Sequence, residues 1–324
     1  MSERSRVAAI DCGTNSIRLL VADRGPQGAL VDVHREMRVV RLGRGVDATG
    51  RFDEQALQDT LAAAADYARI CAENSVDSIR FIATSATRDA ANAHDFLTGV
   101  HEIFGEFDVT AEVITGLEEA QLSFTGATAE LVATADDDGH DADAPYLVVD
   151  IGGGSTEFVR GTREVEQSMS VDVGCVRMTE RHLRDDPPTE DQVWAALSDI
   201  TAAIDQVAAS VDLTGVTTLI GLAGSVTTTT AHALNLPAYE PARIHGSSLA
   251  PVDVVAAANE LLRMGRGERE ALPYMHPGRV DVIGAGALIW RTVVQRLVRD
   301  SGIATVRTSE HDILDGIAWS QIQR

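Results

Sequence analysis

Residues 150–157, Asp-Ile-Gly-Gly-Gly-Ser-Thr-Glu, combine residue types that could bind and process a phosphate group. They follow a short apolar run that is typical of a buried strand. Successive backbone N–H groups of glycines form an anion-binding concavity, because glycine lets the backbone approach a ligand closely. Asp150, just before the glycines, could hold Mg²⁺ against the bound anion. The alternative interpretation is a glycine-rich hairpin turn without a ligand.

A second copy of this pattern opens the chain. Residues 11–16, Asp-Cys-Gly-Thr-Asn-Ser, lie between the apolar segments 7–10 and 17–22, as in a hairpin. Asp11 and Asp150 therefore head matching turns in the two halves of the chain, which indicates an internal duplication. Two domains that each offer a phosphate loop would face one another across a cleft. The matched pair favours phosphate chemistry more strongly than either turn alone.

A further polar turn carries the basic residue Arg88. The apolar strand 78–84 runs into residues 84–89, Thr-Ser-Ala-Thr-Arg-Asp, which lead into a helix through Phe104. A polar junction at the carboxyl end of a strand suits anion binding in an α/β fold. The alternative is that Arg88 is a solvated residue in the first turn of the helix.

Glu119 is the acidic residue that we nominate as a general base. A helix follows the predicted strand 109–114, and Thr115 and Glu118 have the spacing of a capping box at its start. The cap accounts for Glu118 and leaves Glu119 with no assigned role beyond a mild interaction with the helix dipole. Glu119 also lies at the expected domain junction, just before the second phosphate loop in sequence.

The last candidate turn follows the apolar strand 216–222. It contains Gly224 and Ser225, and four consecutive threonines come next at an expected helix start. The hydroxyls and the glycine could contact phosphate or a metal-bound water. A tight packing turn between strand and helix is the alternative, and the two interpretations do not exclude each other.

These turns need strands and helices to position them. Apolar residues at helical spacing predict helices over 53–74, 190–210 and 282–298, and a terminal helix over 309–323. A short strand is also expected over 39–42.

Composition narrows the class of protein. The chain has 324 residues, which is long enough for two domains of ordinary size. All 27 basic residues are arginines, and the net charge of −22 argues against a nucleic-acid partner. An acidic protein that binds polyanions must concentrate positive potential locally, through arginine, backbone N–H groups or metal ions.

Cysteines and apolar runs indicate the compartment. Cys12, Cys71 and Cys175 are widely separated and form no disulfide framework, which fits a reducing environment. No stretch approaches the roughly 20 apolar residues that a membrane helix needs. We therefore expect a cytoplasmic protein that does not bind a membrane.

Other metal and phosphate motifs are missing from the sequence. The nine histidines show no HxH, HxxxH or HExxH spacing, and a GxxxxGK[ST] loop is excluded because the chain has no lysine. The acidic run 136–143 lacks the spacing of a calcium-binding EF-hand and is expected to be a solvated connector.

Taken together, the motifs resemble those of the exopolyphosphatase / guanosine pentaphosphate phosphatase (Ppx/GppA) family. The segments that carry the resemblance occur in the expected order at 10–16, 83–88, 116–120, 150–157 and 224–227. The resemblance covers essentially the whole chain and is to the short, actinobacterial-type exopolyphosphatases. It implies an α/β fold of duplicated actin-like domains (ribonuclease H-like, as in sugar kinases and Hsp70) with a cleft between them. The implied domains are 1–125 and 126–308, and whether the terminal helix 309–324 packs back onto the first domain is open.

The resemblance also implies a role for each matching residue. Glu119 would be the catalytic base that activates water against the terminal phosphoryl group, and Arg88 would offset the charge of that group. Asp150 and Glu157 would help to hold Mg²⁺, or Mn²⁺ as an alternative, with Asp11 a further ligand directly or through water. The residues expected to cradle phosphate are Thr14, Asn15, Gly152, Gly153, Gly154, Ser155, Gly224 and Ser225.

Two residues depart from the family pattern. Thr14 stands where many relatives have serine, a change that keeps the hydroxyl. Gln121 stands where an arginine is frequent, which removes one positive charge and is expected to weaken the grip on long polyanions. The chain also lacks the helical domains of longer relatives, so we expect short to medium polyphosphate chains as substrates.

The function implied by the resemblance is that of an exopolyphosphatase, a phosphoric anhydride hydrolase that releases orthophosphate from inorganic polyphosphate. Guanosine pentaphosphate 5′-phosphohydrolase is the first alternative, with other nucleotides as further substrates. A small-molecule kinase of the actin-like superfamily and a non-catalytic polyphosphate or nucleotide binder are further alternatives. A homodimer is expected from the resemblance only.

Overall fold

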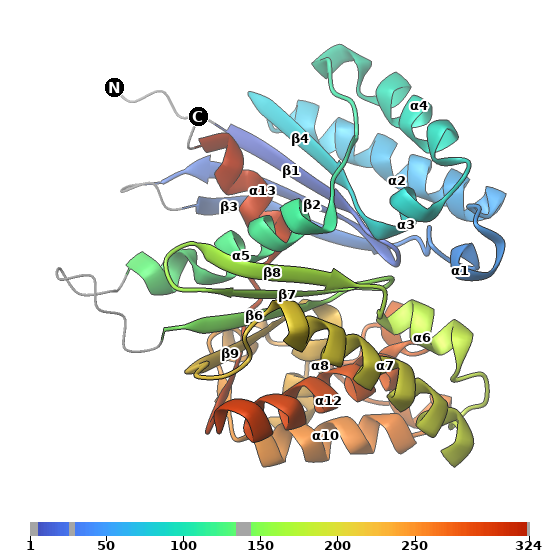
Figure 1. The fold of residues 1–324 in the computed structure, drawn as a ribbon. Helices are drawn as coiled ribbons and strands as arrows, with labels where there is room; N and C mark the ends of the chain where they lie inside the picture. The colour runs from blue at the N-terminus through green and yellow to red at the C-terminus, as the bar shows by residue number, and fades with distance from the viewer. Residues whose placement is uncertain (1–5, 26–29, 134–143, 323–324) are drawn as a thin grey trace. The chain divides into compact units, whose positions relative to one another are not determined.

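The computed structural model describes residues 6–25, 30–133 and 144–322 (Figure 1). The chain forms two compact units, which we call unit 1 and unit 2. Unit 1 contains residues 1–126 and the C-terminal residues 313–324, and unit 2 contains residues between them. The end of the chain therefore returns to the unit in which the chain began.

Unit 1 is built on a five-stranded sheet with the strand order β3-β2-β1-β4-β5. The first three strands are antiparallel neighbours, whereas β4 and β5 run parallel to β1. The strands are β1 (Arg6–Cys12), β2 (Ser16–Arg24), β3 (Leu30–Val39), β4 (Ser78–Ala83) and β5 (Glu112–Val113). Side chains of β1 alternate between two buried clusters, with Ala8 and Ile10 in one and Val7 and Ala9 in the other.

Helices cover both faces of this sheet. The cluster that contains Ile10 takes residues from α2 and α4, and the cluster that contains Val7 takes residues from α5 and α13. The helices of unit 1 are α1 (Val46–Thr49), α2 (Glu54–Glu73), α3 (Ser85–Asp89), α4 (Ala93–Ile103), the 3₁₀ turn η2 (Gly105–Phe107), α5 (Gly116–Ala133) and α13 (Ile313–Ile322). α2 starts where the Asp53 carboxylate accepts a hydrogen bond from the N–H of Ala56 at 3.0 Å.

Unit 2 repeats the plan with a six-stranded sheet of order β10-β11-β9-β6-β7-β8. β6, β7 and β8 are antiparallel neighbours, and β9 runs parallel to β6 as β4 does to β1. The strands are β6 (Tyr146–Ile151), β7 (Thr156–Gly161), β8 (Val165–Val171), β9 (Thr218–Leu222), β10 (Ser248–Leu249) and β11 (Val306–Thr308).

The main core of unit 2 lies between this sheet and the helices α7 and α12, with Trp290 of α12 fully buried in it (Figure 1). α10 packs beside α12. The helices are α6 (Cys175–Arg181), α7 (Glu190–Ser210), α8 (Ala223–Ala233), α9 (Pro241–Ile244), α10 (Pro251–Arg263), α11 (Arg266–Glu270), the 3₁₀ turn η3 (Pro277–Arg279) and α12 (Ile283–Ser301).

The helix expected to run through Phe104 is interrupted. Extended backbone at Ala90 ends α3, and α4 begins three residues later. The side-chain oxygen of Asn92 accepts a hydrogen bond from the N–H of Phe52 at 2.8 Å. This long-range contact stabilises the break between α3 and α4. Local helix propensity does not predict such a contact.

Two expected strands are also corrected. The strand expected over 39–42 is instead β3, which ends at Val39. The N–H groups that follow Val39 donate to carbonyls in the turn of residues 13–16. The strand expected over 109–114 is limited to β5, which follows a left-handed residue at Asp108. Tertiary contacts with the turn of residues 13–16 therefore accompany the end of β3, and a local change of backbone conformation precedes β5.

No helix in the part of the chain that the structure describes is long and apolar enough to cross a bilayer. The predicted acidic connector, 136–143, lies outside the described residues.

Candidate functional site

The two candidate phosphate turns have the same internal hydrogen bond. In unit 1 the N–H of Gly13 donates to the carbonyl of Ser16 at 3.0 Å, in the turn between β1 and β2. In unit 2 the N–H of Gly152 donates to the carbonyl of Ser155 at 3.0 Å, in the turn between β6 and β7. The duplication inferred from the motifs therefore extends to backbone geometry.

Each turn is also held through its carbonyl groups. In unit 1 the carbonyl of Thr14 accepts from the N–H of Gly43 at 2.8 Å, and that of Asn15 accepts from Val40 and Arg41 at 3.1 and 2.9 Å. The carbonyls of the turn are therefore hydrogen-bonded to the segment after β3, and its side chains make separate contacts. The Thr14 hydroxyl forms such a contact with the hydroxyl of Ser85, at 3.0 Å.

The start of α6 holds the unit 2 turn in the same way. The first two residues of α6 donate through their N–H groups to the carbonyls of Gly152 and Gly153 at 3.0 and 2.9 Å. Arg177 donates through its N–H to Gly153 at 3.1 Å and through Nε to the carbonyl of Gly154 at 2.8 Å. All three glycine carbonyls of the turn thus accept hydrogen bonds from α6, which fixes the turn conformation.

Close backbone approach explains a matching glycine behind each turn. A Cβ at Gly43 would lie 2.2 Å from Cγ2 of Thr14, and a Cβ at Gly174 would lie 2.3 Å from the carbonyl oxygen of Gly153. Neither position could carry a side chain without displacing its turn. Gly43, Gly174 and Arg177 were not predicted as part of the site.

The residue opposite the leading aspartate differs between the two hairpins. Asp11 lies opposite Arg18 across β1 and β2, and Nη2 of Arg18 donates to Oδ2 of Asp11 at 2.6 Å. Asp150 lies opposite Glu157 across β6 and β7, so both carboxylates are on the same face of the sheet. These two side chains are only 7% and 1% exposed, and Glu157 accepts a hydrogen bond from the Ser170 hydroxyl at 2.7 Å.

The Asp150–Glu157 pair fits a divalent cation. Like charges directly opposite each other on two strands destabilise a sheet, and a cation between them would remove that repulsion. No group of three or more histidine, cysteine or acidic residues suited to a metal occurs among the described residues. Mg²⁺ does not need one, because one or two carboxylates with phosphate oxygens and water complete its coordination.

Glu119 and Arg88 lie together in unit 1. Nη1 of Arg88 donates to Oε2 of Glu119 at 2.9 Å and to the carbonyl of Ile114 at 2.9 Å. Glu119 is only 8% exposed, so its carboxylate is held beside the guanidinium with little contact to solvent.

The neighbouring Glu118 does not complete the expected capping box. The hydroxyl of Thr115 accepts from the N–H of Glu118 at 3.2 Å, which is one half of the motif. The carboxylate of Glu118 instead pairs with Nη2 of Arg80 at 2.7 Å. Glu118 and Glu119 therefore have different partners, although they are adjacent in sequence.

Gly224 and Ser225 lie in the first turn of helix α8, next to the unit 2 glycine turn. β9 pairs in parallel with β6, so the carboxyl ends of the two strands meet at one edge of the sheet. A Cβ at Gly224 would lie 2.5 Å from Nε of Arg279, and Nη1 of Arg279 donates to the Thr228 hydroxyl at 3.1 Å. Arg279 therefore brings a positive charge to this turn. Nothing in the sequence near it had indicated this role.

The cysteines beside the turns are poor nucleophiles. Cys12 ends β1, and burial raises its pKa well above the ordinary value. Cys175 begins α6, and burial also raises its pKa. Burial therefore disfavours the thiolate, the reactive form of cysteine, at both positions.

Comparison with known proteins gives a consistent result. The Ppx/GppA phosphatase family matches residues 20–321. Exopolyphosphatase 2 of Mycobacterium tuberculosis is 47% identical over 321 residues, which covers 98% of this chain and 98% of that protein.

Solved structures agree with this. The crystal structure of an exopolyphosphatase-like protein superposes with a TM-score of 0.91 at 43% identity, covering 99% of this chain and 98% of that one. A Ppx/GppA protein of Aquifex aeolicus superposes with a TM-score of 0.79 at 28% identity, covering 99% and 98%. The predicted fold class, an α/β protein of the duplicated actin-like type, is confirmed by these neighbours and by the two mixed sheets.

Proposed function

Because the chain belongs to the Ppx/GppA phosphatase family, we propose that it is an exopolyphosphatase that hydrolyses the terminal phosphate of inorganic polyphosphate. The observation that carries the proposal is the buried Glu119 carboxylate paired with Arg88. The Glu119 carboxylate would activate the attacking water as a general base. The same chain has two matched turns that are suited to bind phosphate.

The proposed base is Glu119. Its carboxylate, held by Arg88, would accept a proton from the attacking water. Arg88 would orient the carboxylate and offset the negative charge of the phosphoryl group. Phosphoryl transfer depends mainly on positioning and electrostatic stabilisation. A base that positions water and an arginine that offsets charge are therefore the contributions we propose for unit 1.

The proposed phosphate and metal contacts of unit 2 are at the glycine turn. Backbone N–H groups of Gly153, Gly154 and Ser155 would bind phosphate oxygens, since the turn carbonyls already accept from α6. Asp150 and Glu157 would hold Mg²⁺, or Mn²⁺ in its place. When bound, the metal would neutralise charge on the phosphate oxygens.

Further phosphate contacts are proposed for the other matching positions. Thr14 and Asn15 would contribute from the unit 1 turn, and Gly224 and Ser225 from the turn beside Arg279. Asp11 is a further metal candidate, directly or through water, and its Oδ2 accepts from Arg18.

The preferred substrate, oligomeric state and location are also part of the proposal. Gln121, which is exposed and uncharged, supports short to medium chains over long polyanions. Guanosine pentaphosphate and other nucleotides are alternative substrates, and a homodimer in the cytoplasm is expected. Three buried, unpaired cysteines support a reducing compartment.

The test is orthophosphate release from polyphosphate in the presence of Mg²⁺ by wild type and Glu119→Gln. The substitution keeps size and hydrogen bonding but removes the base, so we expect turnover to fall by about 10²–10⁴-fold while polyphosphate binding persists. Glu118→Gln is the matched control and should stay near wild type, because that carboxylate pairs with Arg80 on the surface.

Several outcomes would overturn the proposal. Near-normal turnover in Glu119→Gln removes that residue from the mechanism. Faster release from guanosine pentaphosphate than from polyphosphate, at matched phosphate concentration, changes the substrate. ATP-dependent phosphorylation of an acceptor would indicate a kinase, and binding without turnover would indicate a non-catalytic polyphosphate binder.

A further inference from the structure

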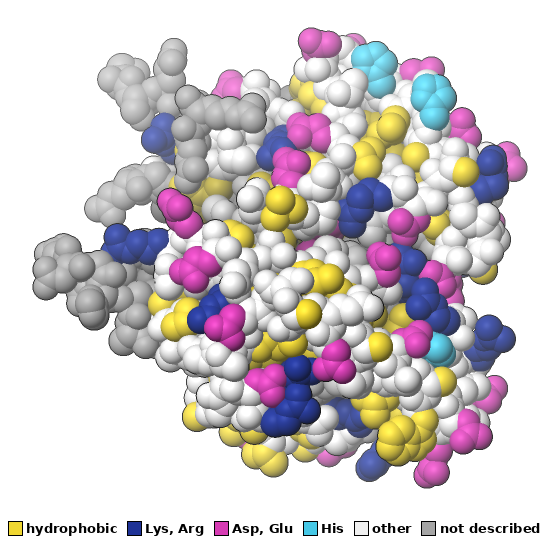
Figure 2. Space-filling view, in the orientation of Figure 1, with side chains coloured by type: hydrophobic (Ala, Val, Ile, Leu, Met, Phe, Trp, Pro, Cys, Tyr) yellow, Lys and Arg dark blue, Asp and Glu magenta, His cyan; other side chains and the backbone are white. Residues whose placement is uncertain are grey.

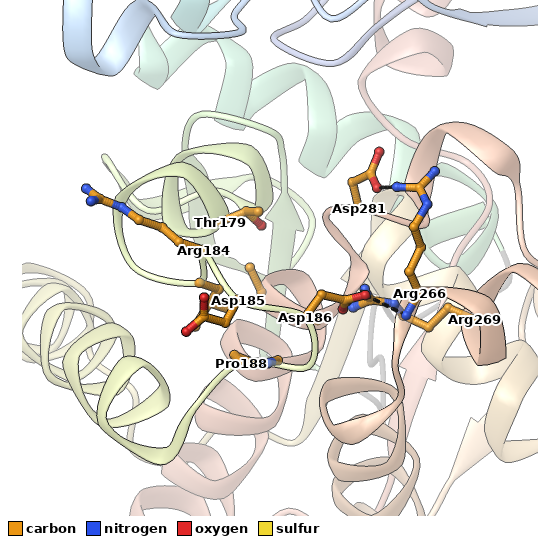
Figure 3. Close-up of a pocket in the computed structure, with 11 residues that line it drawn as sticks. Thr179, Arg184, Asp185, Asp186, Pro188, Arg266, Arg269 and Asp281 are labelled. Carbon is orange, nitrogen blue, oxygen red and sulfur yellow. Dashed lines mark hydrogen bonds and ion pairs between the residues drawn. The ribbon is translucent and has the colours of Figure 1, made fainter.

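Unit 2 contains a cavity of about 220 Å³ beside α11 and the start of α12 (Figure 3). Two arginines on its wall are already matched by carboxylates. Arg266 pairs with Asp281, and Arg269 pairs with Asp186. These ion pairs balance the charge at the cavity, and we assign no ligand to it. A different arginine, in unit 1, carries a stronger indication of function.

Five residues other than glycine have a positive φ in the ranges that the structure describes. Three of them come at the end of a helix or 3₁₀ turn, where left-handed backbone is routine. Ser75 follows the C-cap of α2, Asn235 follows the C-cap of α8, and Asp108 is the C-cap of η2. The other two, Arg41 and Ala223, are not at helix ends and need another explanation.

Arg41 and Ala223 both lie at turns that we propose as phosphate contacts. Ala223, with a φ of 66°, directly precedes Gly224. Arg41, with a φ of 54°, donates its N–H to the carbonyl of Asn15 in the unit 1 turn at 2.9 Å. Left-handed backbone is unfavourable for a residue that has a side chain. Such strain clusters at functional sites, where the surrounding structure maintains it.

Hydrogen bonds on both sides of Arg41 maintain its left-handed conformation. The N–H of Val40 donates to the same Asn15 carbonyl at 3.1 Å, and the carbonyl of Arg41 accepts from the N–H of Arg44 at 2.9 Å. Glycine would adopt this conformation without strain, and a glycine does stand two residues later, at Gly43. The arginine at position 41 therefore indicates that its side chain has a use there.

The segment around Arg41 lies where the two anion-binding elements of unit 1 meet. A Cβ at Gly43 would lie 2.2 Å from Cγ2 of Thr14 and 3.2 Å from Cβ of Ala86 in α3. The same short helix carries Arg88. Arg41 is exposed, so its side chain is accessible to a ligand at this turn.

The arginine of the matching segment in unit 2 is used differently. Arg177 donates through Nε to the carbonyl of Gly154 at 2.8 Å, and its side chain is only 12% exposed. Its guanidinium therefore supports the turn itself. Arg41 contributes its backbone N–H to the corresponding turn and keeps its side chain exposed.

We propose that Arg41 is a further substrate-binding residue, whose guanidinium binds phosphate oxygens of a polyphosphate chain at the unit 1 turn. The planar fork of arginine matches two oxygens of a phosphoryl group with parallel hydrogen bonds. This inference rests on the proposed function, because it adds a residue to the same site for the same class of substrate.

The kinetic test is Arg41→Asn, measured as orthophosphate release over a range of tripolyphosphate concentrations. Asparagine tolerates left-handed backbone, so the substitution removes the guanidinium and leaves the turn in place. We expect KM to rise by about three- to tenfold while kcat stays within about twofold, as for a residue that binds substrate and transition state equally. Arg41→Lys keeps the charge and should restore most of the loss.

Two control variants separate charge from backbone effects. Ser75→Asn places the same residue at another exposed left-handed position, at the end of α2. Arg163→Asn removes the same charge at an exposed position between β7 and β8. Both should match wild type. An unchanged KM in Arg41→Asn, or an equal rise in Arg163→Asn, would overturn the proposal.

Direct binding keeps this inference separable from the proposed function. Calorimetric titration with tripolyphosphate, in the Glu119→Gln background, should show at least threefold weaker binding once Arg41→Asn is added. Binding that depends on Arg41 in a protein that releases no orthophosphate overturns the proposed function alone. Orthophosphate release with unchanged KM and affinity in Arg41→Asn overturns this inference alone.

Discussion

At the scale of single residues, the two hairpins differ at the position opposite the leading aspartate. Arg18 faces Asp11 in unit 1, and Glu157 faces Asp150 in unit 2. The two turns share the hydrogen bond from a glycine N–H to a serine carbonyl, although different segments support their other carbonyls. Arg18 pairs with Asp11 in the first hairpin, whereas the second hairpin places two carboxylates on one face of its sheet. We therefore propose the second hairpin as the cation site.

Glu157→Gln tests this assignment. Removing one of two facing carboxylates should raise the Mg²⁺ concentration for half-maximal activity by about tenfold or more, a size typical of changes at metal sites. The measurement is a Mg²⁺ titration of orthophosphate release. Without Mg²⁺, the variant should unfold at a higher temperature than wild type, because the repulsion between the carboxylates is relieved.

Glu164→Gln serves as the control for that experiment. Glu164 is exposed in the turn between β7 and β8 and should leave the Mg²⁺ dependence unchanged. An unaltered Mg²⁺ titration in Glu157→Gln would contradict its proposed role as a ligand.

At the scale of elements, α6 supports the unit 2 glycine turn through its N-terminal backbone. This support depends on Gly174, where the chain passes against the carbonyl of Gly153. We expect Gly174→Ala to destabilise the protein by about 1–3 kcal/mol, as overpacking usually does. It should also lower turnover, since the turn must move away from the new methyl group.

Urea unfolding and orthophosphate release measure the two effects of Gly174→Ala. The matched control is Gly267→Ala in α11, where a Cβ would meet nothing within 4 Å and alanine favours the helix. Wild-type stability and activity in Gly174→Ala would show that the turn tolerates displacement.

The 3₁₀ turn η3, which presents Arg279, responds to pH through its N-cap. Nδ1 of His276 accepts a hydrogen bond from the N–H of Gly278 at 3.1 Å, so the ring must be neutral at that nitrogen. Burial, followed by the nearby charge of Arg279, lowers the pKa of His276. Above the unfolded pKa of about 6.5 the ring is neutral in both the folded and the unfolded state. The contribution of His276 to the free energy of unfolding is then fully present.

As pH falls below about 6.5, the unfolded chain takes up a proton before the folded one, and stability is lost through the lower folded pKa. We expect wild type to lose more stability between about pH 7.5 and about pH 5.5 than His276→Asn, which keeps a capping acceptor but does not titrate. Urea unfolding at both pH values measures this. Equal losses in the two proteins would exclude His276 as the source.

At the scale of the whole molecule, unit 1 is completed only by the end of the chain. α13 packs on β1 and β2, and Nε2 of Gln321 donates to the carbonyl of Ala8 at 3.0 Å. Nη2 of Arg35 pairs with Oδ1 of Asp315 at 2.5 Å. The sheet face that contains Val7 is therefore covered in part by residues from the far end of the chain.

Ile317→Ala tests the importance of this return. Ile317 is fully buried in the cluster formed with β1 and β2, so we expect a loss of about 2–5 kcal/mol in the free energy of unfolding. Val298→Ala, at an exposed position in α12, should cost far less. Similar unfolding free energies for the two variants would show that α13 contributes little.

Arginine and acidic side chains are intermixed on the surface of this acidic protein, on the face shown in Figure 2. Its net charge is −22, yet on the face shown in Figure 2 arginine side chains lie among acidic ones and form no basic stripe. A strongly negative protein repels polyanions, so we propose that binding uses local donors, such as Arg88, Arg279 and the backbone of the glycine turns.

The sequence by itself determined the family, the α/β class and the two matched turns, because each of these depends on residues that are contiguous in the chain. It also singled out Glu119 and Arg88, whose proposed catalytic roles stay predictions, as do the metal and phosphate contacts. Short motifs carry such information since a turn or a strand end is a local feature of the backbone.

Tertiary structure alone decided how those residues are supported. Gly43 and Gly174 behind the turns, Arg177 at the glycine carbonyls and Arg279 beside Gly224 come from segments distant in sequence. Contacts of this kind arise from packing between elements, for which no local periodicity or motif exists.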